Sequence, residues 1–119
     1  MREFPFPRAF RIQKSEDFRK VYDEGNSVKS DKFAVFFLNK EDISQPARLG
    51  ITVTRRFGKS VQRNRAKRLV REAFRHLHPQ LEKGMDIVVN VRSGVRDTSF
   101  SIVKKDLERL FLRAGLLES

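Results

Sequence analysis

The sequence predicts an α+β fold, a two-layer sandwich in which a small mixed β-sheet packs against about three helices. Apolar residues recur at the 3.6-residue period of a helix in three segments, and short runs of aromatic and β-branched residues stand between them. The resulting order, helix–strand–strand–helix–strand–helix, is typical of two-layer α+β domains. A chain of 119 residues has the length of one such domain.

The N-terminal residues 1–13 are predicted to form an extended, mobile, basic arm ahead of a single α+β domain over residues 14–119. Prolines interrupt the arm and it lacks an apolar run, so it does not have the pattern of a secretion signal. We expect Phe10 and Ile12 to pin the end of the arm to the domain.

The first helix is predicted over Glu16–Glu24, with Ser15 as its N-cap and Gly25 as its stop. Acidic residues fill its first turn, where the helix dipole favours them. One face of the helix carries its larger apolar and aromatic residues, which are Phe18, Val21 and Tyr22.

Three strands are predicted over Lys32–Leu38, Arg48–Thr54 and Met85–Val91. The middle strand alternates between two sets of side chains, with Leu49, Ile51 and Val53 on one side and Gly50, Thr52 and Thr54 on the other. The first set is apolar and the second is small and polar. We therefore expect one face of the sheet to pack on helices and the other face to be shallow and polar.

The second helix has Ser60 as a plausible N-cap and ends near residues 76–79. Its apolar stripe consists of Ala66, Leu69, Val70, Ala73, Phe74 and Leu77. A last helix is capped by Asp97 or Thr98 and stops at Gly115. Its stripe consists of Phe100, Val103, Leu107, Leu110, Phe111 and Ala114.

Most of the positive charge lies in the segment 55–75. This segment holds nine of the 26 Lys and Arg residues but one of the 15 acids, so it carries +8 of the formal net charge of +11. Like charges on one helix face repel by a few tenths of a kcal/mol each. Such a surface is typical of proteins that bind nucleic-acid phosphate. The alternative is a solvated charged helix, but solvated helices usually mix both signs.

Several kinds of chemistry lack the residues that they require. The absence of cysteine excludes disulfides, thiolate metal sites and a cysteine nucleophile. Paired carboxylates, zinc-protease motifs and glycine-rich phosphate loops are also missing, which predicts binding of RNA without cleavage. His76 and His78 could form an acid–base pair, but a helix end that favours cations explains them more simply. No run of ~20 apolar residues could span a membrane, so we expect a soluble, cytoplasmic protein.

Aromatic side chains offer a second possible contact surface. Phe18 and Tyr22 are one helical turn apart, and Phe36 lies on the Ala34/Leu38 side of its strand. Such residues usually belong to a core. The alternative is a stacking platform for unpaired bases, worth ~1–3 kcal/mol per base.

The segment RNRAKR resembles the signature helix of the protein subunit of bacterial ribonuclease P. This similarity rests on Arg63, Asn64, Arg65, Lys67, Arg68 and Arg71. It extends to RRFGK upstream and to the segments SEDFRKVYDEG, RLGITVTRR and DIVVNVR, and so covers about Phe10 to Phe111. Ser60 and Ala66 depart from the family, which usually has Ala and a larger aliphatic residue there.

The resemblance implies a ribonucleoprotein whose large catalytic RNA holds Mg²⁺ ions and removes the 5′ leader from precursor tRNA. The protein would then contribute no catalytic residue, and no cofactor or metal ligand is assigned to it, although the sequence leaves open whether it has a metal site of its own. Its expected partners are the catalytic RNA and precursor tRNA, without a membrane or a small-molecule substrate. The catalytic RNA would contact Arg63, Asn64, Arg65, Lys67, Arg68, Arg71 and Arg75. The single-stranded leader would lie in a cleft between the first helix and the sheet, at Phe18, Tyr22, Phe36, Arg55, Arg56 and Lys59.

The resemblance also implies a left-handed β–α–β crossover around the basic helix, although about 98% of such connections are right-handed. From the residues alone, two other interpretations stay open. One is an RNA-binding module of another ribonucleoprotein, such as a ribosomal protein. The other is an autonomous ribonuclease that uses His76 and His78.

Overall fold

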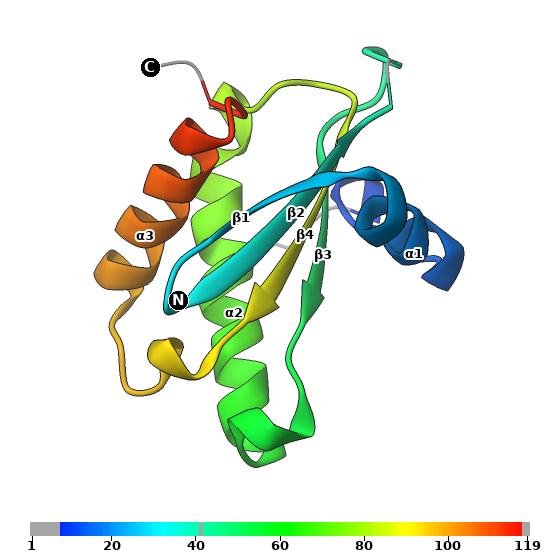
Figure 1. The fold of residues 1–119 in the computed structure, drawn as a ribbon. Helices are drawn as coiled ribbons and strands as arrows, with labels where there is room; N and C mark the ends of the chain where they lie inside the picture. Colours follow the sequence, from blue (N-terminus) through cyan, green and yellow to red (C-terminus); the bar gives the residue numbers. More distant parts are fainter. Residues whose placement is uncertain (1–7, 41, 118–119) are drawn as a thin grey trace.

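A computed structural model describes residues 8–40 and 42–117 of the chain. These residues form three α-helices and one four-stranded mixed sheet (Figure 1). The helices are α1 (Ser15–Glu24), α2 (Ser60–Leu77) and α3 (Phe100–Arg113). The strands, in their order across the sheet, are β1 (Asn26–Lys29), β2 (Phe33–Asn39), β4 (Met85–Val91) and β3 (Arg48–Thr52). The predicted α+β class is confirmed.

The strands β3 and β4 are parallel and are joined by α2, whereas β1–β2 and β2–β4 are antiparallel. In Figure 1 both parallel strands point downward, β4 lies to the left of β3, and α2 passes behind the sheet. This arrangement is a left-handed β–α–β crossover, as the resemblance implied, and not the usual right-handed one.

The predicted order of elements is confirmed, with one strand added. The edge strand β1 was not predicted, because its sequence NSVK has one apolar residue, Val28, and no alternation. It follows α1 directly and pairs with β2 along four residue pairs. The other strands agree with their predicted ranges within two residues. β4 has the predicted bounds, β2 is shifted by one residue, and β3 ends two residues early, at Thr52.

The predicted N-caps are wrong by one or two positions. Ser15 and Ser60 are the first helical residues, and the extended N-cap positions are taken by lysines. At α2 the side chain of Gln62 accepts a hydrogen bond from the backbone N–H of Lys59 at 2.9 Å. This bond gives the N–H of the N-cap residue a partner, and no serine side chain is needed for it. At α3 the cap is Ser99, whose hydroxyl accepts from the N–H of Ile102, while Asp97 takes a φ of 63° in the preceding turn.

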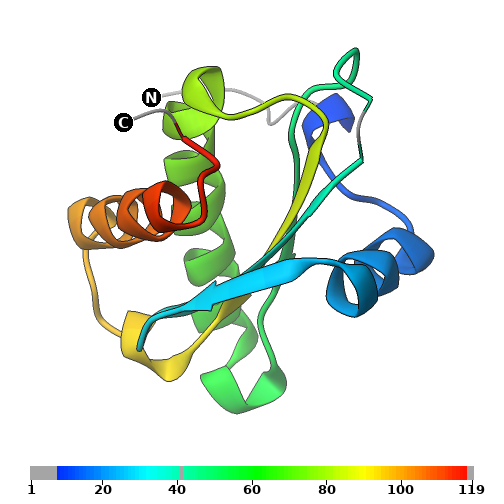
Figure 2. The same ribbon diagram turned by 45° about the horizontal axis from the view of Figure 1, so that its top comes forward.

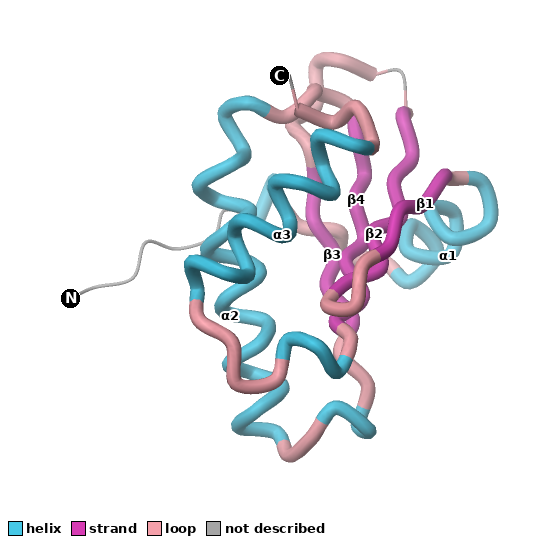
Figure 3. The backbone as a smooth tube through the Cα atoms, turned by 60° about the vertical axis from the view of Figure 1, so that its left-hand side comes forward, coloured by secondary structure: helices cyan, strands magenta, loops and turns pink. Residues whose placement is uncertain are grey.

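The main core lies between the sheet and the pair α2–α3, which cover the same face (Figure 3). From α2 it receives most of the predicted stripe, with Ala66, Val70, Ala73, Phe74 and Leu77 all buried. From β3 it receives Leu49, with Ile51 of the strand and Val53 just beyond its end packed against it, so the predicted alternation is confirmed. Burial of this seam fixes which side of α2 faces outward.

The opposite face of the sheet carries α1, and Figure 2 shows α1 and α2 on the two sides of the strands. The prediction that the second face of the sheet is shallow and polar is wrong where α1 covers it. A smaller apolar cluster of Ile12, Val21 and Val88 is buried there. Around it pack the half-buried side chains of Phe18, Phe36 and Leu38. The polar character predicted from Gly50 and Thr52 holds only beyond the part that α1 covers.

Residues 1–7 of the predicted basic arm lie outside the described residues, and the rest of that segment lies against the sheet. The backbone N–H of Ile12 donates to the carbonyl of Leu49 at 2.9 Å, and its side chain is buried. The ring of Phe10 stacks on His78 at a centroid distance of 3.8 Å. Burial lowers the pKa of His78, although its hydrogen bond to the carbonyl of Ala47 acts in the opposite direction.

Candidate nucleic-acid interface

The outward side of α2 presents the predicted RNA-contact residues, because the opposite side is buried in the core. Asn64, Arg65 and Arg68 are exposed, and the other predicted side chains are half-buried. The half-buried ones are Arg63, Lys67, Arg71 and Arg75. We call these seven residues the cationic face of α2.

The carboxylates that the structure describes neutralise little of this face. Glu72 pairs with Arg75 and lies 3.5 Å from the Nε2 atom of His76. The hydrogen bond from Arg75 is the main cause that lowers the pKa of Glu72. Within residues 8–40 and 42–117, no salt bridge involves any other member of the cationic face. The positive charge predicted from the sequence is therefore available to an external polyanion.

Several arginines of this face are held by backbone carbonyl groups. Arg63 donates to the carbonyl of Gly58 at 2.6 Å, and Arg65 donates to that of Thr98 at 2.7 Å. A side chain that is already restrained loses less conformational entropy when it binds a phosphate. The cationic face is therefore partly preorganised.

Arg96 is a neighbouring cation that the sequence analysis did not single out. Its guanidinium group lies 5.5 Å from the ring centre of Phe57 and donates to the Phe57 carbonyl. Together with Gln62, Arg65 and Asp97, these two residues line a pocket of about 310 Å³. Arg96 ends the one-turn 3₁₀ helix Ser93–Val95 that follows β4, a segment too short for a periodic pattern to mark a residue as part of a surface.

A short 3₁₀ helix, Arg55–Phe57, connects β3 to α2 at the lower end of the molecule in Figure 1. Phe57 is buried and anchors this turn, while Arg55, Arg56 and Lys59 are exposed. These three predicted leader-contact residues thus lie beyond the C-terminal end of β3, at the edge where the α1 side and the α2 side of the sheet meet.

The three predicted cleft aromatics come together on the α1 side of the sheet. The rings of Tyr22 and Phe36 meet edge to face with centroids 4.9 Å apart. The ring of Phe18 covers Gly50, because a Cβ added there would come within 2.4 Å of it. Tyr22 remains 37% exposed, and Phe18 and Phe36 are half-buried. The aromatics therefore act as part of a small core and still present ring surface to solvent.

Polar residues form the floor of this cleft. The strand register aligns Lys29, Ala34, Asn90 and Thr52 in one row across the sheet. The hydroxyl of Tyr22 donates to the Oδ1 atom of Asn90 at 2.7 Å and lies 3.3 Å from the Oγ1 atom of Thr52. Asn90 was not predicted as a site residue, although a single amide in the apolar run MDIVVNV is a visible signal.

An ion pair holds α1 in place over the cleft. The guanidinium group of Arg48 bonds both carboxylate oxygens of the buried Asp86, at 2.8 and 2.7 Å. The same group reaches Asp17 of α1 at 3.5 Å, and Lys40 lies 3.7 Å from Asp86. The hydrogen bond to Asp86 is the main cause that raises the pKa of Arg48.

The structure does not bring His76 and His78 together as an acid–base pair. His78 stacks on Phe10 and bonds the carbonyl of Ala47, whereas His76 pairs with Glu72 and contacts the ring of Phe100. Side chains two positions apart on a helix point in different directions. Among the described residues, no group of three or more His, Asp or Glu side chains could hold a metal ion. None of their helices is long and apolar enough to cross a membrane.

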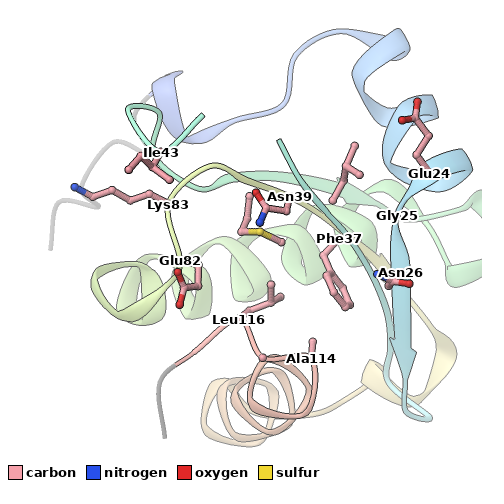
Figure 4. Close-up of a pocket in the computed structure, with 13 residues that line it drawn as sticks. Glu24, Gly25, Asn26, Phe37, Asn39, Ile43, Glu82, Lys83, Ala114 and Leu116 are labelled. Carbon is pink, nitrogen blue, oxygen red and sulfur yellow. The ribbon is translucent and has the colours of Figure 1, made fainter. Parts of the chain in front are cut away.

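A larger pocket of about 730 Å³ lies elsewhere, between the ends of α1, β2 and α3 (Figure 4). Its wall combines apolar side chains, including Phe37 and Leu116, with the carboxylates of Glu24 and Glu82. It shares no residue with the cationic face or with the aromatic cleft. Lys83 is the one cation in this lining against two carboxylates, so the pocket does not suit a polyanion.

A mixed α+β body, a cationic helix face without matching carboxylates and an aromatic cleft with a polar floor define an RNA-binding protein. Comparison with known proteins identifies the family. The family model described as Ribonuclease P matches residues 6–115.

Individual relatives agree with the family model. The ribonuclease P protein component of Symbiobacterium thermophilum is 40% identical over 93% of this chain and 96% of its own length. That of Shouchella clausii is 41% identical over 90% of this chain and 87% of its own. Among solved structures, the Staphylococcus aureus RNase P protein aligns with a TM-score of 0.83 and 32% identity, over 92% of this chain and 98% of that one. The Thermotoga maritima protein gives 0.79 and 35% over the same shares.

The chain belongs to the ribonuclease P protein family. It is accordingly the protein component of the enzyme that matures the 5′ ends of tRNA, and its partner is the ribonuclease P RNA.

Removing the carboxylate of Asp86 should destabilise the domain strongly. Asp86→Ala leaves the guanidinium group of Arg48 without its buried partner, which we expect to cost about 2–4 kcal/mol in the free energy of unfolding. Asp17→Ala is the matched control, since Asp17 is more exposed and its contact longer, and should cost below about 1 kcal/mol. Urea unfolding of both variants measures the difference, and equal losses would show that the buried pair does not hold the sheet together.

Proposed function

We propose that the cationic face of α2 binds the ribonuclease P RNA, and that the cleft beneath α1 binds the single-stranded 5′ leader of precursor tRNA. The observation that carries the first part is the positive charge of α2 that the described carboxylates leave unpaired. In this proposal the RNA subunit carries the Mg²⁺ ions and the cleavage chemistry, and the protein contributes binding alone.

The two surfaces lie on opposite faces of one sheet, which supports separate partners for them. The cationic face suits the closely spaced phosphates of a folded RNA, because it offers charge and donors without aromatic surface. The cleft suits a single strand, because bases that are not paired can stack on Phe18, Tyr22 or Phe36. The exposed Arg55, Arg56 and Lys59 lie between the two surfaces and can neutralise phosphates near the junction.

Reconstitution tests the whole proposal. At a Mg²⁺ concentration too low for the RNA subunit alone, adding the protein should restore removal of the leader, because its cations replace part of the screening that Mg²⁺ supplies. The measurement is cleavage of precursor tRNA by the RNA alone, the protein alone and the mixture. Cleavage by the protein alone, lost in a His76→Ala/His78→Ala variant, would contradict it in favour of an autonomous ribonuclease.

Loss of one phosphate contact should weaken binding of the RNA subunit and change its salt dependence. The affinity falls as salt rises, and Arg68→Ala is expected to make this dependence shallower, reducing the magnitude of the slope of log K against log salt by about one unit. Lys105→Ala is the control, since Lys105 is an exposed cation on α3 outside the cationic face, and should keep the wild-type slope. Filter binding across a salt series measures both, and an unchanged slope for Arg68→Ala would remove this residue from the interface.

Loss of one cleft ring should narrow the preference for precursor over mature tRNA. Phe18→Ala is expected to reduce the ratio of the two affinities about fivefold or more, because a stacked base is worth ~1–3 kcal/mol. Phe10→Ala is the control, since Phe10 is also half-buried but stacks on His78 away from the cleft. Far-UV circular dichroism must accompany the measurement, and loss of helical signal in Phe18→Ala would assign Phe18 to the core instead.

A further inference from the structure

Arg65 and Arg96 connect the start of α2 with the turn that precedes α3. Arg65, on α2, donates to the carbonyl of Thr98 in that turn at 2.7 Å. Arg96, in the same turn, donates to the carbonyl of Phe57 in the turn that precedes α2, and its guanidinium group lies 5.5 Å from the centre of the Phe57 ring. Two arginines that are distant in the chain are thereby held around one pocket of about 310 Å³.

The side chains around this pocket offer mainly hydrogen-bond donors. A guanidinium group has several donors and no acceptor. Arg65 and Arg96 each use one nitrogen for a carbonyl group, and their other N–H groups have no hydrogen-bond partner among the described residues. The Oε1 atom of Gln62 accepts from the N–H of Lys59, which leaves the Nε2 donors of Gln62 available. A ligand that accepts several hydrogen bonds at once, such as a phosphate group, suits this lining.

The charge of the pocket also favours an anion. Two guanidinium groups line it against one carboxylate, that of Asp97. Within the part of the chain that the structure describes, no salt bridge joins Asp97 to Arg65 or Arg96. Asp97 has a φ of 63°, a backbone conformation that Asp and Asn adopt more readily than most residues. The turn therefore accounts for an acid at this position, and both arginines keep their charge for a ligand.

We propose that Arg96, Arg65 and Gln62 form a site for one backbone phosphate of the ribonuclease P RNA. This inference rests on the proposed binding of that RNA by the cationic face, and it adds Arg96 and Gln62 to the contact. The pocket adjoins the cationic face through Arg65, and both arginines are exposed, so a phosphate can reach them without any opening of the fold. Because their side chains are already restrained, they lose little conformational entropy on binding.

Loss of the Arg96 charge should weaken binding of the RNA subunit and make it less dependent on salt. Arg96→Gln is expected to lower the affinity about threefold or more and to reduce the magnitude of the slope of log K against log salt by about one unit. Arg109→Gln is the matched control, since Arg109 is an exposed arginine on α3 outside the pocket, and should keep the wild-type slope. Filter binding across a salt series measures both variants. A purely structural role of Arg96 would lower the stability and leave the slope unchanged.

Asp97→Asn tests the same site with an effect of opposite sign. Asparagine tolerates the left-handed backbone, and the change removes the one acid that lines the pocket. The affinity for the RNA subunit should rise about 1.5- to 5-fold, the range for one charge pair at a surface. Glu108→Gln is its control, because Glu108 lies on α3 outside the pocket, and should give a smaller rise. Equal or lower affinity in Asp97→Asn would contradict an anion in this pocket, and this variant decides the question if Arg96→Gln does not fold.

The source of the phosphate is tested with the assembled enzyme. Its affinity for precursor tRNA should be the same with wild-type protein and with Arg96→Gln. A weaker affinity for precursor tRNA, together with unchanged binding of the RNA subunit, would place the phosphate on the precursor and overturn the inference. A wild-type slope in Arg96→Gln beside a shallower slope in Arg68→Ala would overturn the inference and leave the proposed function standing. Wild-type slopes in both variants would overturn the proposed binding of the RNA by the cationic face.

Discussion

Burial of the apolar seam of α2 against the sheet is the interaction on which the rest of the structure depends. Phe74 and Leu77 are almost fully buried, and each such side chain contributes about 1.5–3 kcal/mol. Repulsion between neighbouring cations on the outer side costs only a few tenths of a kcal/mol per pair. The seam therefore outweighs the repulsion, and the helix can keep its outer charge for a partner instead of neutralising it with its own carboxylates.

The sheet separates the cationic face of α2 from the cleft beneath α1. One face is filled by the core beneath α2 and α3, so nothing can enter there. The other face is covered by α1 only in part, and the ion pair of Arg48 with Asp86 and Asp17 fixes how far that cover extends. Because Asp86 is buried in the sheet, the position of α1 is tied to the rigid part of the domain. The open floor beside Asn90 follows from this placement.

The periodic parts of the fold could be predicted from the sequence, and the parts without a period could not. The stripe of α2 and the alternation of β3 are long enough to identify both elements and their buried sides. The strand β1 has four residues and no alternation, and its pairing with β2 depends on where α1 ends. Arg96 lies beside the cationic face of α2 because it contacts Phe57, which is 39 residues away in the chain. Patterns among neighbouring residues in the sequence cannot predict such long-range contacts.

The two surfaces also differ in what their binding energy can do for the enzyme. If the cationic face binds the RNA subunit as proposed, those contacts are the same whether precursor or product is bound, so they would hold the particle together without favouring either. If the cleft binds the leader as proposed, its contacts exist only while the leader is attached, so they would strengthen binding of the precursor and be lost after cleavage. Binding that is lost with the leader does not delay release of the product. A modest cleft with half-buried rings would therefore be sufficient, because it needs only to add selectivity to an affinity that the cationic face supplies.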